Sequence, residues 1–105
     1  MFHGSLDNSG SIAANGLDAS RGTTFVSRDP LASADAIGPK RPEFPGRDPG
    51  VVESRIPQAE FDRVLAANER PYRGFYPYTL DSTEIPLRSA EQIELFNRYI
   101  HGGVG

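Results

Sequence analysis

The chain contains no cysteine, which excludes a disulfide framework, a thiolate nucleophile and any metal site with cysteine ligands. It has two histidines, His3 and His101, and its acidic residues follow neither an EF-hand loop nor a His-Glu-x-x-His motif. We therefore expect no metal site. Its glycines form neither a phosphate-binding P-loop nor a Rossmann dinucleotide motif.

Long apolar runs are also absent from the sequence. No stretch approaches the length of a membrane span, and no charged segment followed by an apolar one opens the chain. We expect no membrane partner. If the protein is exported, we expect the export signal to lie elsewhere, on a larger parent chain.

The chain has no surplus of positive charge, because its formal net charge is -3. This disfavours a protein that holds nucleic acid by neutralising many phosphates, but it does not exclude an enzyme that acts on nucleic acid. The length of 105 residues predicts a single domain over residues 1–105 with a modest core. Eleven glycines and nine prolines predict that much of the chain is turn and loop.

Sequence patterns predict short strands and helices in alternation. Strands are expected at 1–4, 23–26, 51–52 and 83–87, and helices within 5–18, 30–37, 57–69 and 89–100. The remaining segments are a proline-rich loop at 39–49, an aromatic, turn-rich segment at 70–82 and a tail at 101–105 that we expect to be frayed. This order predicts an α+β domain, or a mixed α/β one, with little sheet per strand.

Several residues set local expectations within this order. Gly16 stands where a helix ends in the left-handed conformation, and Asp29 is a good N-cap for the second helix. In that helix we expect Leu31 and Ala34 to face the core. Pro86 limits the last strand to the edge of a sheet or to a strand end.

Three short motifs carry residues suited to chemistry. They are His3-Gly4-Ser5 at the end of the first strand, Phe25 in the second strand, and Glu84 at the start of the last strand. Each is weak alone, because a single histidine, a strand phenylalanine or a strand-end glutamate usually has a purely structural role. Their arrangement along the chain is more specific.

In this order the motifs resemble those of the ADP-ribosyltransferase superfamily, in the His-Tyr-Glu branch of diphtheria toxin and the poly(ADP-ribose) polymerases. "FHGS" at 2–5 is similar to the His-Gly-Ser or His-Gly-Thr that ends the family's first strand, and "SIAANGL" at 11–17 to the helix after it. "GTTFVSRDPLASADAI" at 22–37 is similar to the next strand and helix, with Phe25 at the tyrosine position. "YPYTLDSTEIPL" at 76–87 resembles the loop and strand that carry the family's glutamate.

The resemblance implies a small split β-sheet core with short flanking helices, and NAD as the substrate. It implies an NAD-dependent mono-ADP-ribosyltransferase that transfers ADP-ribose to a macromolecular acceptor, either protein or nucleic acid. In this role the Glu84 carboxylate hydrogen-bonds a ribose hydroxyl and stabilises the positive charge of an oxocarbenium-like state. The aromatic face of Phe25 stacks on the cationic nicotinamide ring.

The same resemblance implies NAD contacts for four further residues. His3 is expected to hydrogen-bond the adenosine-side ribose, and the bare backbone of Gly4 to pair with the carboxamide. Ser5 is expected to add a hydroxyl contact to the bound dinucleotide, and Ser27 to belong to the same NAD-binding site.

Other positions bear on the acceptor. Tyr76 and Tyr78 lie in the segment before Glu84, where the family recognises its target, although packing is an equal alternative for them. Ser82 stands two residues before Glu84, so the Glu-x-Glu pattern of arginine-modifying transferases is absent and the acceptor stays open.

Small transferase domains of this type commonly form the C-terminal toxin tips of large bacterial secreted proteins, such as Rhs-type and contact-dependent effectors. The resemblance therefore implies secretion or delivery into the cytoplasm of a target cell as part of a larger effector. It also implies a cognate immunity protein.

Other functions remain open. An NAD glycohydrolase would use the same pocket. A metal-independent ribonuclease toxin would use His3 or His101 with Glu84 as general acid and base, and its phosphate contacts would come from Arg21, Arg28 or Arg73. A non-catalytic interaction module would use the loop at 39–49 and the aromatic segment at 71–78 as its contact surface.

Overall fold

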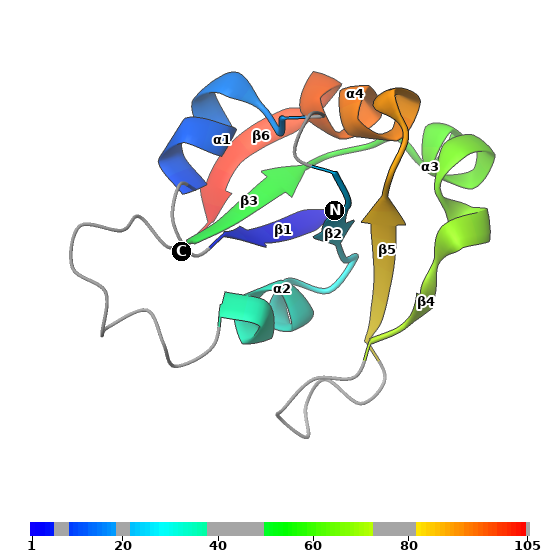
Figure 1. Ribbon diagram of the computed structural model, residues 1–105, viewed down its shortest axis with the longest axis horizontal. Coiled ribbons are helices and arrows are strands. Elements are labelled where there is room, and N and C mark those ends of the chain that lie inside the picture. The colour runs from blue at the N-terminus through cyan, green and yellow to red at the C-terminus, as the bar shows by residue number, and fades with distance from the viewer. Residues whose placement is uncertain (6–8, 19–21, 38–49, 73–81, 105) are drawn as a thin grey trace.

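Short strands and helices alternate along the chain, as the sequence predicts (Figure 1). The computed structural model describes residues 1–5, 9–18, 22–37, 50–72 and 82–104. The elements are β1 (Phe2–Ser5), α1 (Ser9–Asn15), β2 (Thr24–Val26), α2 (Pro30–Ile37), β3 (Gly50–Ser54), α3 (Gln58–Val64), a 3-10 helix (Ala66–Asn68), β4 (Arg70–Pro71), β5 (Thr83–Leu87), α4 (Ala90–Arg98) and β6 (Ile100–Val104).

The strands form two small antiparallel sheets, so the predicted α+β class is confirmed. One sheet has the order β1-β3-β6 and the other the order β2-β5-β4. The sheets meet where Phe2 pairs with Ser27: the Phe2 N–H donates to the Ser27 carbonyl at 2.7 Å, and the Ser27 N–H donates to the Phe2 carbonyl at 2.8 Å. This pair brings the end of β2 against the start of β1.

The hydrophobic core joins both sheets and three of the helices. Its most enclosed members are Leu65, Ile85, Leu87, Val52 and Phe96, each with 0% of its surface exposed. Helices α1 and α4 lie along one side of the β1-β3-β6 sheet in Figure 1, and α2 lies on its other side. Since residues from β3, β5 and α4 share this core, the two sheets are held together by apolar burial as well as by the Phe2–Ser27 pair.

The C-terminal tail corrects the sequence prediction. Residues 100–104 form β6, which pairs antiparallel with β3, with Val104 opposite Val51 and Gly103 opposite Val52. The prediction of a frayed tail was wrong because a ladder of backbone hydrogen bonds needs no side chains. Glycine is weak in a strand by itself, but β3 supplies a partner along this stretch.

The position of Pro86 departs partly from its prediction. Strand β5 lies in the centre of its sheet, with β2 on one side and β4 on the other. However, β4 pairs only with Thr83 and Glu84 of β5. On the β4 side of the sheet, Pro86 therefore has no strand partner among the described residues. Proline's missing N–H is therefore tolerated inside a central strand.

Helix α2 begins as predicted but buries a different face. The Asp29 side chain accepts a hydrogen bond from the Leu31 N–H at 2.9 Å, which caps the helix. Leu31 is nevertheless 50% exposed, whereas Ala32 and Asp35 are each 2% exposed. The prediction that Leu31 faces the core was wrong: the buried positions of α2 include the small Ala32 and the polar Asp35, which has a hydrogen-bond partner within the protein. The Tyr72 hydroxyl donates to Asp35 at 2.7 Å, for example.

Gly16 ends α1 in the left-handed conformation, as predicted, with φ of +87°. The side chain of Asn97 from α4 lies directly against it, so a Cβ atom at this position would come within 2.7 Å of Asn97 Cγ. Asn97 accepts a hydrogen bond from the Leu17 N–H at 2.7 Å and donates one to the Leu17 carbonyl at 3.0 Å. The end of α1 is thus fixed to α4.

None of the helices in the described ranges is long and apolar enough to cross a membrane.

Candidate functional site

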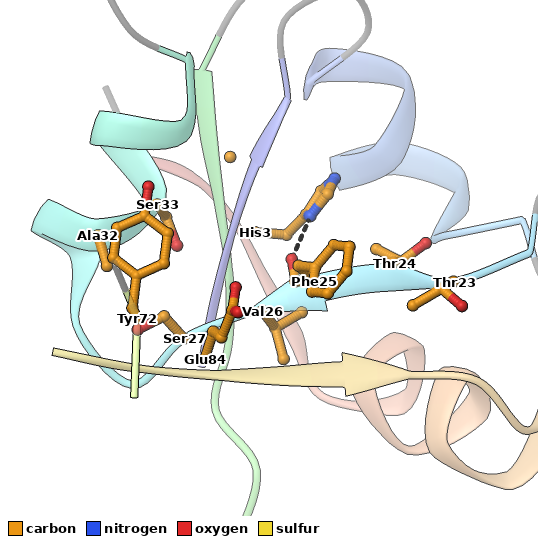
Figure 2. A pocket seen from close by; sticks show the side chains of 11 residues that line it. His3, Thr23, Thr24, Phe25, Val26, Ser27, Ala32, Ser33, Tyr72 and Glu84 are labelled. Atoms are coloured by element: carbon orange, nitrogen blue, oxygen red, sulfur yellow. Dashed lines mark hydrogen bonds between the residues drawn. The ribbon is translucent and has the colours of Figure 1, made fainter. Parts of the chain in front are cut away.

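A cleft of about 370 Å³ opens between β1, β2, α2 and β5 (Figure 2). Its walls combine a histidine, a glutamate, two aromatic rings and several hydroxyl and small side chains. The lining residues are His3, Gly4, Thr23, Thr24, Phe25, Val26, Ser27, Ala32, Ser33, Tyr72 and Glu84. A cavity of this size and mixed lining is typical of a small-molecule site.

The cleft gathers most of the residues that the sequence singled out. His3, Gly4, Phe25, Ser27 and Glu84 all line it, although they come from three different strands. Their contacts with a ligand stay predictions.

Ser5, another predicted site residue, does not line this cleft. Ser5 is only 6% exposed and is not among the lining residues. Tyr76 and Tyr78, the predicted target-recognition residues, lie outside the described residues.

His3 lies at the junction of this cleft with a second cavity. Its Nδ1 atom is 2.9 Å from the Phe25 carbonyl oxygen, and because a carbonyl only accepts, Nδ1 carries the proton and donates. Nε2 is then the acceptor nitrogen. Burial lowers the pKa of His3 below its ordinary value of 6.5, although the hydrogen bond to Phe25 acts in the opposite direction. His3 is therefore a neutral acceptor at pH 7.

The second cavity has a volume of about 450 Å³ and adjoins the cleft along His3 and Thr24, which line both. Its other lining residues belong to α1 and the turn after it: Ser11, Ile12, Asn15, Gly16, Leu17 and Asp18. His3 and Thr24 therefore stand where the two cavities meet.

Two aromatic side chains line the cleft. Phe25 is 46% exposed, which is unusual for a strand phenylalanine and leaves much of its ring open to a ligand. Tyr72 follows β4, and its hydroxyl is fixed by donation to the buried Asp35 carboxylate at 2.7 Å. Tyr72 was not among the predicted NAD-contacting residues, because it stands in a segment with no periodic pattern; it was predicted only as part of the aromatic segment at 71–78 of a non-catalytic interaction module. Its aromatic side chain was the one available signal.

Glu84 stands on β5 with its side chain 21% exposed. In the view of Figure 2 it lies between the rings of Tyr72 and Phe25. Arg70 of β4 donates from Nε to Glu84 Oε1 at 3.0 Å. A partly enclosed carboxylate beside an exposed aromatic ring suits a ligand that is both planar and cationic.

Ser27 uses its hydroxyl within the protein. It donates to the Thr83 carbonyl at 2.5 Å and accepts from the Asp29 N–H at 3.0 Å, and only 3% of the residue is exposed. These bonds join the end of β2 to the residue just before Glu84. Ser27 therefore orients β5, and any contact of its hydroxyl with NAD would have to be made in addition to these bonds.

The Ser82 hydroxyl is used within the protein and not in the cleft. Its hydroxyl donates to Asp29 Oδ2, the residue is 6% exposed, and it does not line the cleft. Ser82, two residues before Glu84, thus joins the start of β5 to the start of α2.

Of the residues predicted for a ribonuclease, His3 and Glu84 both line the cleft. His101 lies on β6 in the other sheet, and Arg28 is held by Glu69 through two hydrogen bonds of 2.7 and 2.6 Å. No arginine or lysine is among the described residues that line this cleft or the second cavity, so a phosphate group, of RNA or of NAD, would need a cationic partner from elsewhere. Arg21 and Arg73 lie outside the described residues.

No group of three or more histidines, aspartates or glutamates suited to a metal ion occurs among the described residues. Comparison of the chain with protein-family models, with curated proteins and with solved structures finds no match in any of the three.

Proposed function

We propose that this chain is an NAD-dependent mono-ADP-ribosyltransferase domain with an ADP-ribosyltransferase-like split sheet. The observation that carries the proposal is the convergence of His3, Phe25 and Glu84 on one cleft from three strands that are distant in sequence. A neutral imidazole, an exposed aromatic ring and a carboxylate match, in turn, a ribose, a cationic nicotinamide ring and a developing oxocarbenium ion.

The pair of cavities supports a dinucleotide as substrate. NAD joins two nucleosides through a diphosphate, and the protein offers two cavities, of about 370 and 450 Å³, that share His3 and Thr24 in their walls. Phe25 and Glu84 lie in the first cavity, which we assign to the nicotinamide riboside half. The polar second cavity, with Asn15 and Asp18, then takes the adenosine half. His3 Nε2 accepts a hydrogen bond from a ribose hydroxyl between them.

The proposed reaction breaks the bond between the ribose C1′ atom and the nicotinamide nitrogen. The bonding electron pair leaves with the nicotinamide, which becomes neutral, and positive charge develops on the ribose. Glu84 stabilises this charge through the ribose hydroxyl that it holds. A nucleophile of the acceptor then bonds to C1′ and releases one proton to solvent. If water is the nucleophile, the same steps make an NAD glycohydrolase.

We extend the proposal to the biological setting that the resemblance implies. The domain acts as a toxin in a competitor or host cell, delivered into its cytoplasm as part of a larger bacterial effector. A cognate immunity protein protects the producing cell. This part rests on the resemblance alone, and it predicts that expression of the wild-type domain, but not of Glu84→Gln, stops bacterial growth.

The test uses purified protein, NAD labelled in its adenylate phosphate, and a bacterial lysate. Nicotinamide release and transfer of label to macromolecules are measured together for the wild type and Glu84→Gln. Label fixed by the wild type alone establishes a transferase, and nuclease or protease digestion then identifies the class of acceptor. Nicotinamide release without transfer establishes a glycohydrolase. Intact and unbound NAD in both samples would overturn the proposal.

Glu53 offers a matched control for the glutamate substitution. Its carboxylate is 19% exposed and pairs with Arg55 at 2.9 Å, which closely matches Glu84 with its 21% exposure and its arginine at 3.0 Å. Glu53 lies on β3 and is not among the residues lining either cavity described above. Glu53→Gln is expected to keep the wild-type rate of nicotinamide release, whereas Glu84→Gln is expected to lose it.

A further inference from the structure

Arg70 contacts two residues of the cleft without lining the cleft itself. Its Nε donates to Glu84 Oε1 at 3.0 Å, and its guanidinium carbon lies 5.5 Å from the centre of the Phe25 ring. A cation at this distance from a ring is within the range of a cation–π contact. One side chain thus contacts both the proposed carboxylate and the proposed stacking ring.

The register of the sheet explains how one arginine reaches both partners. Arg70 pairs with Glu84 across β4 and β5, and Phe25 pairs with Pro86 across β2 and β5. Paired residues share a face of the sheet, and so do residues two apart in a strand. All four side chains therefore lie on the same face. The arginine extends over the central strand, from an edge strand of two residues towards the ring on the far strand.

The contact with Glu84 uses one carboxylate oxygen. Among the described residues, Arg70 engages Oε1 through a single hydrogen bond, while the carboxylate as a whole lines the cleft. Oε2 is left as the oxygen that can accept a hydrogen bond from a ligand. A carboxylate fixed through one oxygen loses rotational freedom about its last side-chain bonds, and the direction of the other oxygen is set before the ligand arrives.

We propose, resting on the proposed function, that Arg70 is a positioning residue for cleavage of the nicotinamide–ribose bond. It fixes the Glu84 carboxylate through Oε1 so that Oε2 meets the ribose hydroxyl, and it steadies the ring of Phe25. Arg70 itself does not touch the substrate. Its effect falls on the rate of the chemical step, because a small error in the position of a catalytic group lowers the rate far more than it lowers affinity.

The experiment measures nicotinamide release under steady-state conditions, and NAD affinity by calorimetry, for the wild type, Arg70→Ala and Arg70→Lys. Arg70→Ala is expected to lower kcat by roughly tenfold to a hundredfold while the Kd for NAD changes less than about threefold. Arg70→Lys keeps a cation that can reach the carboxylate but loses the planar group. It is expected to recover part of kcat.

Arg55→Ala is the matched control. Arg55, directly after β3, donates from Nε to Glu53 Oε1 at 2.9 Å, so its removal breaks an ion pair between the same atom types at a similar distance outside the cleft. We expect kcat and Kd to stay at their wild-type values. Thermal unfolding of all variants checks that the fold is kept. The Arg70 side chain is 47% exposed, and exposed ion pairs contribute little to stability. We therefore expect Arg70→Ala to keep the fold.

The outcomes separate the two proposals. If the wild type neither binds nor cleaves NAD, the proposed function is overturned, and the role of Arg70 with it. If the wild type is active and Arg70→Ala keeps its kcat, only the role of Arg70 is overturned. The same holds if the loss appears in Kd rather than in kcat, or if Arg55→Ala causes an equal loss.

Discussion

Single residues in the cleft have properties that depart from those of an average surface or core residue. His3 has a lowered pKa because of burial, and its tautomer is fixed by the Phe25 carbonyl. Phe25 is exposed where a strand phenylalanine is usually buried. Both features leave a group open to a ligand, an acceptor nitrogen in one case and an aromatic face in the other.

The state of His3 predicts how NAD affinity varies with pH. Because burial lowers its pKa, His3 stays neutral from pH 8 down past its ordinary value of 6.5, and gains a proton only at lower pH. Protonation converts Nε2 from acceptor to donor, so the Kd for NAD is expected to rise by about twofold to tenfold as the pH falls towards 5. Calorimetry across this range measures the effect. A pH profile of His3→Gln as steep as that of the wild type would contradict it.

Protonation of His3 also lowers the stability of the fold, and the sign follows from linkage. The unfolded chain takes up the proton first, near pH 6.5, because the pKa of the folded form is lower. The stability contributed by neutral His3 is therefore fully present above the ordinary value. It is lost as the pH falls from there through the folded pKa.

Phe25 predicts a loss of NAD affinity without loss of the fold. Its ring stacks on the nicotinamide in the proposed complex, so Phe25→Ala is expected to weaken NAD binding by about twofold to thirtyfold, and Phe25→Tyr to preserve it. Leu31→Ala is the control, since Leu31 is 50% exposed and does not line the cleft. Calorimetric Kd values for the three variants make the comparison. Equal losses for Phe25→Ala and Leu31→Ala would argue against stacking.

At the scale of the elements, the junction of β2, α2 and β5 determines where Glu84 lies. The Ser27 hydroxyl bonds to the Thr83 carbonyl and the Asp29 N–H, and Asp29 in turn bonds to Ser82 and caps α2. A short strand of three residues, β2, is thereby held to its neighbours by side chains as well as by its ladder. Such support matters because strands this short have few backbone bonds of their own.

Removal of the Ser27 hydroxyl is therefore expected to affect both stability and activity. Ser27→Ala leaves a nearly buried carbonyl and N–H without that partner, which costs about 1–3 kcal/mol of the free energy of unfolding. It also frees the start of β5, so nicotinamide release should fall as well. Urea unfolding and the release assay measure the two effects.

Ser89→Ala is the control for this prediction. Ser89 accepts a hydrogen bond from the Gln92 N–H in the capping box of α4, so its loss costs about 1 kcal/mol of stability without touching the cleft. It is expected to keep its activity. A Ser27→Ala variant that is destabilised but fully active would show that the junction does not orient Glu84.

At the scale of the whole molecule, a modest core carries most of the stability. Phe96 of α4 is 0% exposed and belongs to the core shared by both sheets. Phe96→Ala is expected to cost about 3–5 kcal/mol of the free energy of unfolding, a large part of the 5–15 kcal/mol typical of a domain. Phe25→Ala, at a residue that is 46% exposed, should cost much less in the same urea titration. Similar losses would contradict the assigned core.

The sequence was sufficient for the features that depend on local pattern. The strand at 83–87, the Asp29 cap and the left-handed Gly16 follow from a few neighbouring residues, and all three are found. His3, Phe25 and Glu84 were selected because their motifs follow one another in a family-like order, and the folded chain brings them to one cleft.

Features that depend on distant partners were not predictable in the same way. The glycine-rich β6 is a strand because β3 lies beside it, and the polar Asp35 is buried on α2 with the Tyr72 hydroxyl as a hydrogen-bond partner. The contact of Arg70 with Glu84 depends on a strand of two residues, which no periodicity in the sequence marks. In each case a residue far along the chain decides the local outcome.

The pairing of Phe2 with Ser27 determines from where the walls of the cleft are built. Its two backbone hydrogen bonds, of 2.7 and 2.8 Å, join the two sheets at one residue pair. His3 and Phe25 lie within two residues of this pair and are hydrogen-bonded across it, so the imidazole and the ring enter the cleft from one junction. Glu84 lies on β5, on the far side of β2 from this junction, so its distance from His3 depends on the pairing of β2 with β5 and on the Ser27–Thr83 hydrogen bond.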